Sequence, residues 1–179
     1  MFYDDICFEV NENKAKKTYS DVYTIHKNYV PAHDYFLVKI KNNLPVPFED
    51  KEKMVIKYRD GKKTSGIAAE NKDGWYEAKL RNFGDYYLDI DTTAPTISSL
   101  QKTNDLSNAK TIRFSVKEET TSVKEFRATL DGQWILFEPF GNVYTYKFDK
   151  YCGKGKHQLI IKAKDENDNE AVLKYEFVR

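Results

Sequence analysis

Histidine is the residue type in this sequence with the widest chemical range, because imidazole can bind zinc and move protons near neutral pH. The chain has three histidines, His26, His33 and His157. None of them has a partner at i,i+2 or i,i+4 that would place two zinc ligands on one strand or helix. The sequence also lacks the Gly-x-Ser-x-Gly turn of a serine nucleophile and the glycine-rich loops that bind phosphate. We therefore expect no catalytic residue, with the histidines at strand ends and in loops.

Residues 165–170, Asp-Glu-Asn-Asp-Asn-Glu, gather carboxylate and amide oxygens, which are the ligands that calcium prefers. The run lacks the glycine at the sixth position of an EF-hand loop, and Asp and Asn are also well suited to tight turns. Two interpretations of this run therefore stay open, a solvated turn between two strands and a calcium site. The calcium interpretation gains if Asp91 approaches from the linker, and its ligands would be Asp91, Asp165, Asn167 and Asn169. No other cofactor is expected.

Three aromatic residues, Trp75, Tyr87 and Trp134, fall on or near the outward side of predicted strands or beside turns. A flat ring in such a place can stack on a sugar or on a partner side chain. Packing within the core or on the face of a sheet is the competing interpretation. For Trp134 it is favoured, because the following Ile-Leu-Phe run lacks alternation and predicts a strand buried on both faces.

Composition excludes several classes of partner and linkage. The 29 basic and 28 acidic residues leave a formal net charge of +1, so nucleic acid is a poor partner. Cys7 and Cys152 fall in different halves of the chain, which excludes a disulfide within either half, and Cys7 is expected on or near the surface. No apolar run is long enough to span a membrane.

Apolar and polar residues alternate along most of the chain, which predicts an all-β protein. The 13 tyrosines also favour half-buried, pleated surfaces. In the first half, strands are predicted at residues 6–10, 22–26, 35–40, 54–58, 75–80 and 86–91, with a loop at 11–20. In the second half, seven short strands are predicted, and Asp131-Gly132 joins one of them to the strand at 133–137 as a two-residue hairpin turn.

The segment Asp-Thr-Thr-Ala-Pro-Thr-Ile, residues 91–97, separates two runs of alternating residues. Pro95 has no N–H to donate to a central ladder, so a single strand is not expected to run through it. We predict two tandem immunoglobulin-like β-sandwich domains. The first covers residues 1–91, a linker covers 92–96, and the second covers 97–179. Tyr86, Leu88 and Ile90 are expected to face the first core.

Each half contains a sequence typical of a tyrosine corner, in which a tyrosine hydroxyl bonds to the backbone a few residues upstream. In the first half it is Asn-Phe-Gly-Asp-Tyr, ending at Tyr86. In the second half it is Gly-Lys-His, where His157 takes the place of the tyrosine. The halves therefore look like weak structural repeats.

Several of these segments resemble the C-terminal region of secreted bacterial metallopeptidases of the lysostaphin-like class, which cut peptidoglycan cross-bridges. The resemblance is carried by residues 22–26 with Pro31, Asp34 and Tyr35, by 60–65, by 74–75 and 82–86, and by 91–97. It continues through 131–134 and 155–157 with Asp165 and Asn169, and so covers nearly the whole chain. The catalytic domain of that class binds zinc through His-x-x-x-Asp and His-x-His pairs, and neither occurs here.

The resemblance therefore implies a non-catalytic, extracytoplasmic accessory region at the C-terminal end of a longer chain. Its partner would be the catalytic peptidase domain of the same parent chain or the cell-wall glycan, and the peptidase domain would perform the hydrolysis. Two alternatives stay open. One is a module that binds glycan or peptidoglycan through its exposed aromatic residues. The other is a calcium-stiffened segment of a surface adhesin or stalk.

Overall fold

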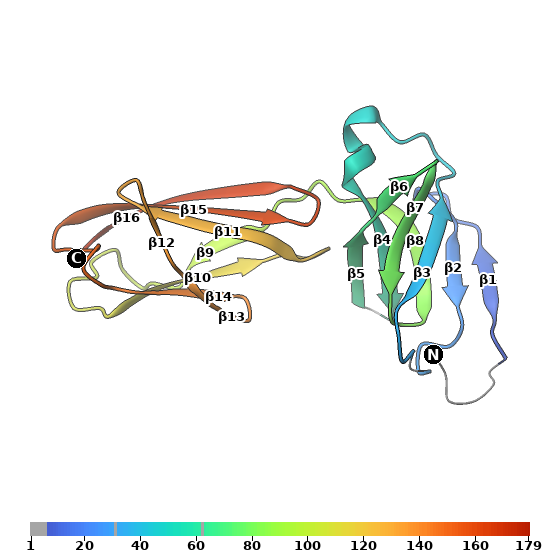
Figure 1. Cartoon of the computed structure of the whole chain (residues 1–179), viewed down its shortest axis with the longest axis horizontal. Coiled ribbons are helices and arrows are strands. Elements are labelled where there is room, and N and C mark those ends of the chain that lie inside the picture. Colours follow the sequence, from blue (N-terminus) through green and yellow to red (C-terminus); the bar gives the residue numbers. More distant parts are fainter. Residues whose placement is uncertain (1–6, 31, 62) are drawn as a thin grey trace. The chain divides into compact units, whose positions relative to one another are not determined.

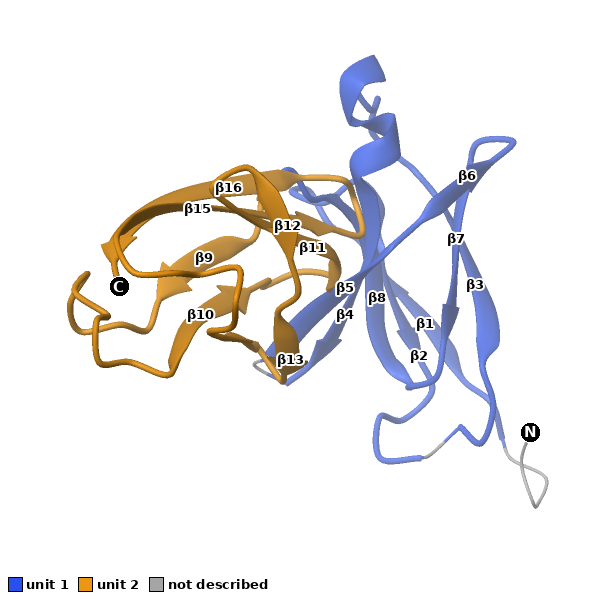
Figure 2. Ribbon diagram, turned by 60° about the vertical axis from the view of Figure 1, so that its left-hand side comes forward, with its two compact units in different colours: residues 1–92 blue, residues 93–179 orange. Residues whose placement is uncertain are grey.

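The computed structural model describes residues 7–30, 32–61 and 63–179, so Ile6, Pro31 and Lys62 lie outside the described residues. The chain is all-β and forms two tandem immunoglobulin-like β-sandwich units, Met1–Thr92 and Thr93–Arg179 (Figure 2). Within the described ranges, no helical segment has the length and hydropathy of a membrane-spanning helix.

The first unit is a sandwich of two antiparallel sheets (Figure 1). The larger sheet has the strand order β1-β2-β8-β4-β5, and the smaller one has the order β3-β7-β6. The strands are β1 Val10–Asn13, β2 Val22–Ile25, β3 Phe36–Lys41, β4 Met54–Asp60, β5 Lys63–Ala68, β6 Glu70–Lys72, β7 Trp75–Leu80 and β8 Gly84–Ile90. A 3-10 helix, η1, covers Phe48–Lys53 between β3 and β4.

Alternate residues of the two sheets form one apolar core. Tyr86 and Leu88 on β8 are buried, and Ile90 packs against the same cluster, so the predicted inward face of this strand is confirmed. Tyr76 and Leu80 on β7 face them from the smaller sheet. Each large apolar side chain buried in this way stabilises the fold by about 1.5–3 kcal/mol.

The second unit has two four-stranded antiparallel sheets, ordered β13-β14-β10-β9 and β12-β11-β15-β16. The strands β9, β10, β13 and β14 therefore share one sheet, and the hairpins β11-β12 and β15-β16 form the other, as in immunoglobulin-like sandwiches. The strands are β9 Thr96–Ser99, β10 Thr111–Lys117, β11 Val123–Leu130, β12 Gln133–Ile135, β13 Glu138–Phe140, β14 Val143–Lys147, β15 Lys156–Asp165 and β16 Glu170–Val178.

The core of the second unit lies between these sheets. Ile112 and Phe114 come from β10, and Leu159 and Ile161 come from β15; all four side chains are fully buried. The predicted turn at Asp131-Gly132 is confirmed: Leu130 pairs with Gln133, and both turn residues have positive φ, 49° and 84°. This conformation is the one that two-residue hairpins require.

The first unit departs from the sequence prediction at its edges. Of the strand expected at 6–10, residues 7–9 are not in a strand, and β1 instead runs from Val10 into the segment expected to be a loop. All four β1 residues are exposed, so pairing with β2 defines this strand and apolar alternation does not. The strands β5 and β6 and the helix η1 were not predicted, because their residues are mostly polar.

The second unit departs from the prediction after Trp134. The strand expected across residues 133–137 ends at Ile135, and an additional strand, β13, follows at Glu138. Trp134 is 60% exposed and Leu136 is 64% exposed, so the prediction of a strand buried on both faces is wrong. Because β12 is the edge strand of its sheet, Trp134 has a neighbouring strand on one side only, and its side chain stays open to water.

Candidate functional site

His157 lies near the start of β15 and uses both nitrogens of its ring within the second unit. Nδ1 lies 2.7 Å from Oδ2 of Asp131, in the β11–β12 turn, and Nε2 lies 2.9 Å from the carbonyl oxygen of Gly153. Only the doubly protonated ring can donate to both acceptors. Burial lowers the pKa of His157, but the bonds to Asp131 and Gly153 outweigh it and the pKa is raised. This arrangement fixes the preceding loop and leaves neither nitrogen for zinc.

The first unit has the corresponding bond from a tyrosine. The hydroxyl of Tyr86 donates to the carbonyl oxygen of Asn82, four residues upstream, which confirms the predicted tyrosine corner. His157 reaches Gly153 over the same four-residue separation. Burial raises the pKa of Tyr86 well above its usual range, so the hydroxyl is protonated and can donate near neutral pH.

Asp165 organises the turn between β15 and β16. Its side chain is fully buried, Oδ1 accepts from the backbone N–H groups of Asn167 (2.8 Å) and Asn169 (2.9 Å), and Oδ2 accepts from the amide of Asn169 (2.7 Å). The run forms a turn between β15 and β16, as one interpretation predicted, but the turn is not solvated, because the side chains of Asp165, Asn167 and Asn169 are buried. A carboxylate oxygen of Glu118 lies within 4.8 Å of one of Asp165, so these two residues could also hold a cation. The calcium site with Asp91, Asp165, Asn167 and Asn169 stays a prediction.

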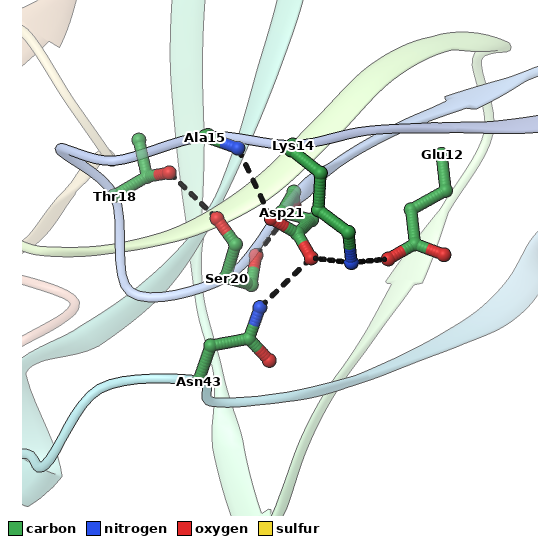
Figure 3. A network of polar contacts seen from close by, with 7 residues as sticks. All are labelled: Glu12, Lys14, Ala15, Thr18, Ser20, Asp21 and Asn43. Carbon is green, nitrogen blue, oxygen red and sulfur yellow. Dashed lines mark hydrogen bonds and ion pairs between the residues drawn. The ribbon is translucent and has the colours of Figure 1, made fainter.

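A polar network around Asp21 fixes the segment before β2 (Figure 3). The carboxylate of Asp21 accepts from Lys14 Nζ (2.9 Å), Ala15 N (3.0 Å) and Asn43 Nδ2 (3.0 Å). The hydrogen bonds from Lys14 and Ala15 lower the pKa of Asp21 to about 2. Next to it, Ser20 Oγ accepts from the backbone N–H of Leu88 (2.9 Å), which joins the segment to β8. The network has a structural role, because the donors and acceptors named above bond to one another.

The three predicted ligand-binding aromatic residues do not form one site. Trp75 lies on the outward face of the β3-β7-β6 sheet and is 44% exposed. Tyr87 is half-buried on the outward face of the other sheet of the same unit, opposite Lys57. Trp75 and Tyr87 therefore face away from each other across the sandwich. Trp134 belongs to the second unit, where other exposed residues gather around it.

We call the hollow beside Trp134 the Trp134 groove. It has a volume of about 270 Å³ and lies where β12, β13 and β14 meet at the open edge of the second sandwich. Leu136 and Tyr151 are as exposed as Trp134. Buried Ile135 and Tyr146 also contact the hollow, and its polar lining consists of Glu138, Thr145, Lys147 and Asp149.

Sequence reasoning identified Trp134 but missed the other groove residues. Leu136 was assigned to the core, and Tyr151 lies outside every predicted strand. The one sequence signal was the Glu-Pro pair at 138–139, since proline is confined to edge strands and marks this edge of the sandwich as open.

Comparison with known proteins matches a family model to the first unit and finds solved structures with low similarity to the chain. A family model described as a Zu5-like domain matches residues 1–91. The chain is similar to fibronectin(III)-like modules of Clostridium thermocellum CbhA, with 12% identity and a TM-score of 0.39, over 82% of this chain and 86% of that one. It is also similar to the N-terminal four Ig domains of Dscam1 isoform 8.4, with 13% identity and a TM-score of 0.30, over 95% and 46%. No curated protein matches the chain.

Proposed function

The chain belongs to the Zu5-like domain family, and we propose that it is a non-catalytic accessory module of a secreted cell-wall peptidase. Its two units would act by binding and by geometry, restricting how the catalytic domain of the parent chain meets peptidoglycan. The sequence resemblance to the C-terminal region of lysostaphin-like metallopeptidases supports this proposal, and it implies an extracytoplasmic location.

The observation that carries the proposal is the state of His157. A histidine hydrogen-bonded to a carboxylate is a common arrangement for a general base or a zinc ligand, in which the second nitrogen faces the substrate or the metal. Here the second nitrogen faces the carbonyl oxygen of Gly153 at 2.9 Å. The pair of His157 and Asp131 is therefore used to hold a loop, and this favours a scaffold role over a catalytic one.

The non-catalytic part is tested with purified peptidoglycan sacculi. The full chain is incubated with sacculi in the presence of zinc or of EDTA, and soluble muropeptides are measured by chromatography. We expect no release in either condition. Zinc-dependent release by the pure chain would overturn the proposal.

The accessory part is tested by fusion. A lysostaphin-like catalytic domain is joined either to the full chain or to a flexible linker of equal length, and both fusions are assayed on sacculi and on a soluble cross-bridge peptide. We expect the chain to change the rate on sacculi and to leave the rate on the peptide unchanged. Equal rates for the two fusions on sacculi would contradict an accessory role.

A further inference from the structure

We propose that the Trp134 groove binds one sugar ring of a neutral glycan chain, with the apolar face of the ring stacked on the indole of Trp134. The choice of a cell-wall sugar as the ligand rests on the proposed function, whereas the stacking site itself does not. The groove volume of about 270 Å³ is close to the lower limit, roughly 300 Å³, of small-molecule sites, and this size suits one ring of a glycan chain.

The backbone that carries the exposed aromatic side chains of the groove is held in place. Trp134 lies on β12, just after the tight Asp131-Gly132 turn, and is the cross-strand partner of Thr129 on β11. The backbone N–H of Tyr151 donates to Oδ1 of Asp149 at 2.9 Å, which orders the chain at this residue. A backbone that is ordered before binding loses little conformational entropy when a ligand stacks on the rings that it carries.

The polar lining fits a ligand rich in hydroxyl groups. Glu138 and Asp149 provide carboxylate acceptors, Thr145 provides a hydroxyl and Lys147 provides a donor. Oδ1 of Asp149 already accepts from the hydroxyl of Tyr146 at 2.6 Å, which orients the carboxylate. With two carboxylates and one ammonium group the lining has a net negative charge, so a polyanionic ligand is disfavoured and a neutral glycan is favoured.

An added peptide strand is a poorer fit to the same edge. The edge strands β12 and β13 have three residues each, and Pro139 in the middle of β13 has no N–H to offer. Strand addition obtains its affinity from a continuous row of main-chain hydrogen bonds, which this edge cannot provide.

Tryptophan fluorescence tests the proposal directly, since the chain has two tryptophans. In the Trp75→Phe variant, Trp134 alone reports, and the protein is titrated with tetra-N-acetylchitotetraose up to 10 mM. We expect saturable quenching with a shift of the emission maximum. Trp134→Ala, measured by calorimetry, should weaken binding at least about tenfold, the loss expected for one stacked ring. Trp75→Ala should leave the affinity unchanged.

Because Trp134 is 60% exposed, its replacement is expected to leave the core intact, and thermal melting checks this. Glu138→Gln gives a second variant, which should weaken binding without removing the ring. The groove proposal is overturned if no signal appears up to 10 mM, if Trp134→Ala binds as tightly as the parent, or if only an acidic polysaccharide such as alginate binds. These results leave the fusion assay unaffected, so failure of the groove and failure of the accessory role are distinguishable.

Discussion

The imidazole of His157 lies 2.7 Å from the carboxylate of Asp131, measured from Nδ1 to Oδ2. Asp131 lies in the turn between β11 and β12, and His157 lies at the start of β15. Asp131 also accepts from the backbone N–H of Gln158 through Oδ1, at 2.8 Å. Burial raises the pKa of Asp131, but the bonds from Gln158 and His157 outweigh it, and the pKa is lowered. The turn between β11 and β12 is thereby joined to the start of β15 by a charged pair.

The charged pair makes the stability of the second unit depend on pH. The pKa of His157 is raised in the folded state, so its contribution is complete below the pKa of the unfolded chain, near 6.5, and is lost as pH rises through the folded pKa. Urea unfolding of the full chain should therefore show lower stability at pH 8.5 than at pH 5.5. The loss should stay below about 1 kcal/mol, because Asp131 is half exposed to water.

His157→Gln should remove this pH dependence, whereas His33→Gln, at an exposed histidine of the first unit, should retain it. A slope of equal size in His157→Gln would show that another group is responsible. Direct titration of the His157 ring by NMR should give a pKa above the ordinary histidine value.

Tyr86→Phe removes the hydroxyl that bonds to the carbonyl oxygen of Asn82 and leaves the ring in place. Since the tyrosine is 1% exposed, we expect the first unit to lose about 1–2 kcal/mol of unfolding free energy. Tyr87→Phe is the matched control, because it removes a hydroxyl one residue along on the opposite face of β8. A change within about 0.5 kcal/mol is expected there. Equal losses in the two variants would argue against a specific corner.

Gly84 begins β8 at a point where no side chain fits. A Cβ atom there would lie 2.7 Å from Cε2 of Tyr58 and 3.2 Å from the carbonyl oxygen of Arg59, and φ is +151°. Gly84→Ala should cost at least about 2 kcal/mol in denaturant unfolding, from crowding and backbone strain together. Gly74→Ala separates the two causes: φ is +82° but no atom lies within 4 Å, so only strain of about 1 kcal/mol is expected. A smaller loss for Gly84→Ala than for Gly74→Ala would refute the crowding argument.

The inward positions of the central strands could be predicted because burial on one face imposes a period of two. Tyr86, Leu88 and the Asp131-Gly132 turn are examples in which local pattern and tertiary structure agree. Edge strands are different, since one partner strand is enough to define them. Exposed β1 and polar β6 carry no alternation that a reader of the sequence could detect.

The groove illustrates the same limit for a site. Trp134, Leu136 and Tyr151 are brought together by the crossing of the chain from β12 to β13 and by the loop after β14. None of these features has a local signature, and the run Ile-Leu-Phe points to a core. The sequence could therefore identify an aromatic residue of interest, but not whether water or protein covers it.

Asp21→Asn tests the polar tie of the first unit. The hydrogen bonds from Lys14 and Ala15 lower the pKa of Asp21 from 3.8 to about 2, so its contribution is present above the unfolded value and is lost as pH falls through the folded value. The variant should be less stable than the parent at pH 7, and its stability should fall less steeply between pH 4 and pH 2. Asp73→Asn, at an exposed turn, should match the parent in both measurements. If Asp21→Asn retains the full acid slope, other carboxylates account for it.

Asp165→Asn distinguishes a structural turn from a calcium site. In EDTA, the substitution places a donor amide against the side-chain amide of Asn169, which now donates to Oδ2 at 2.7 Å, and we expect a loss of about 1–3 kcal/mol. Asp168→Asn in the same turn should cost less than about 1 kcal/mol, because that carboxylate is exposed and its ion pair with Lys124 is solvated. If the turn is purely structural, calcium should not change the melting temperature of the parent protein. A parent that gains stability with calcium, together with an Asp165→Asn variant that matches it in EDTA, would instead establish the metal site.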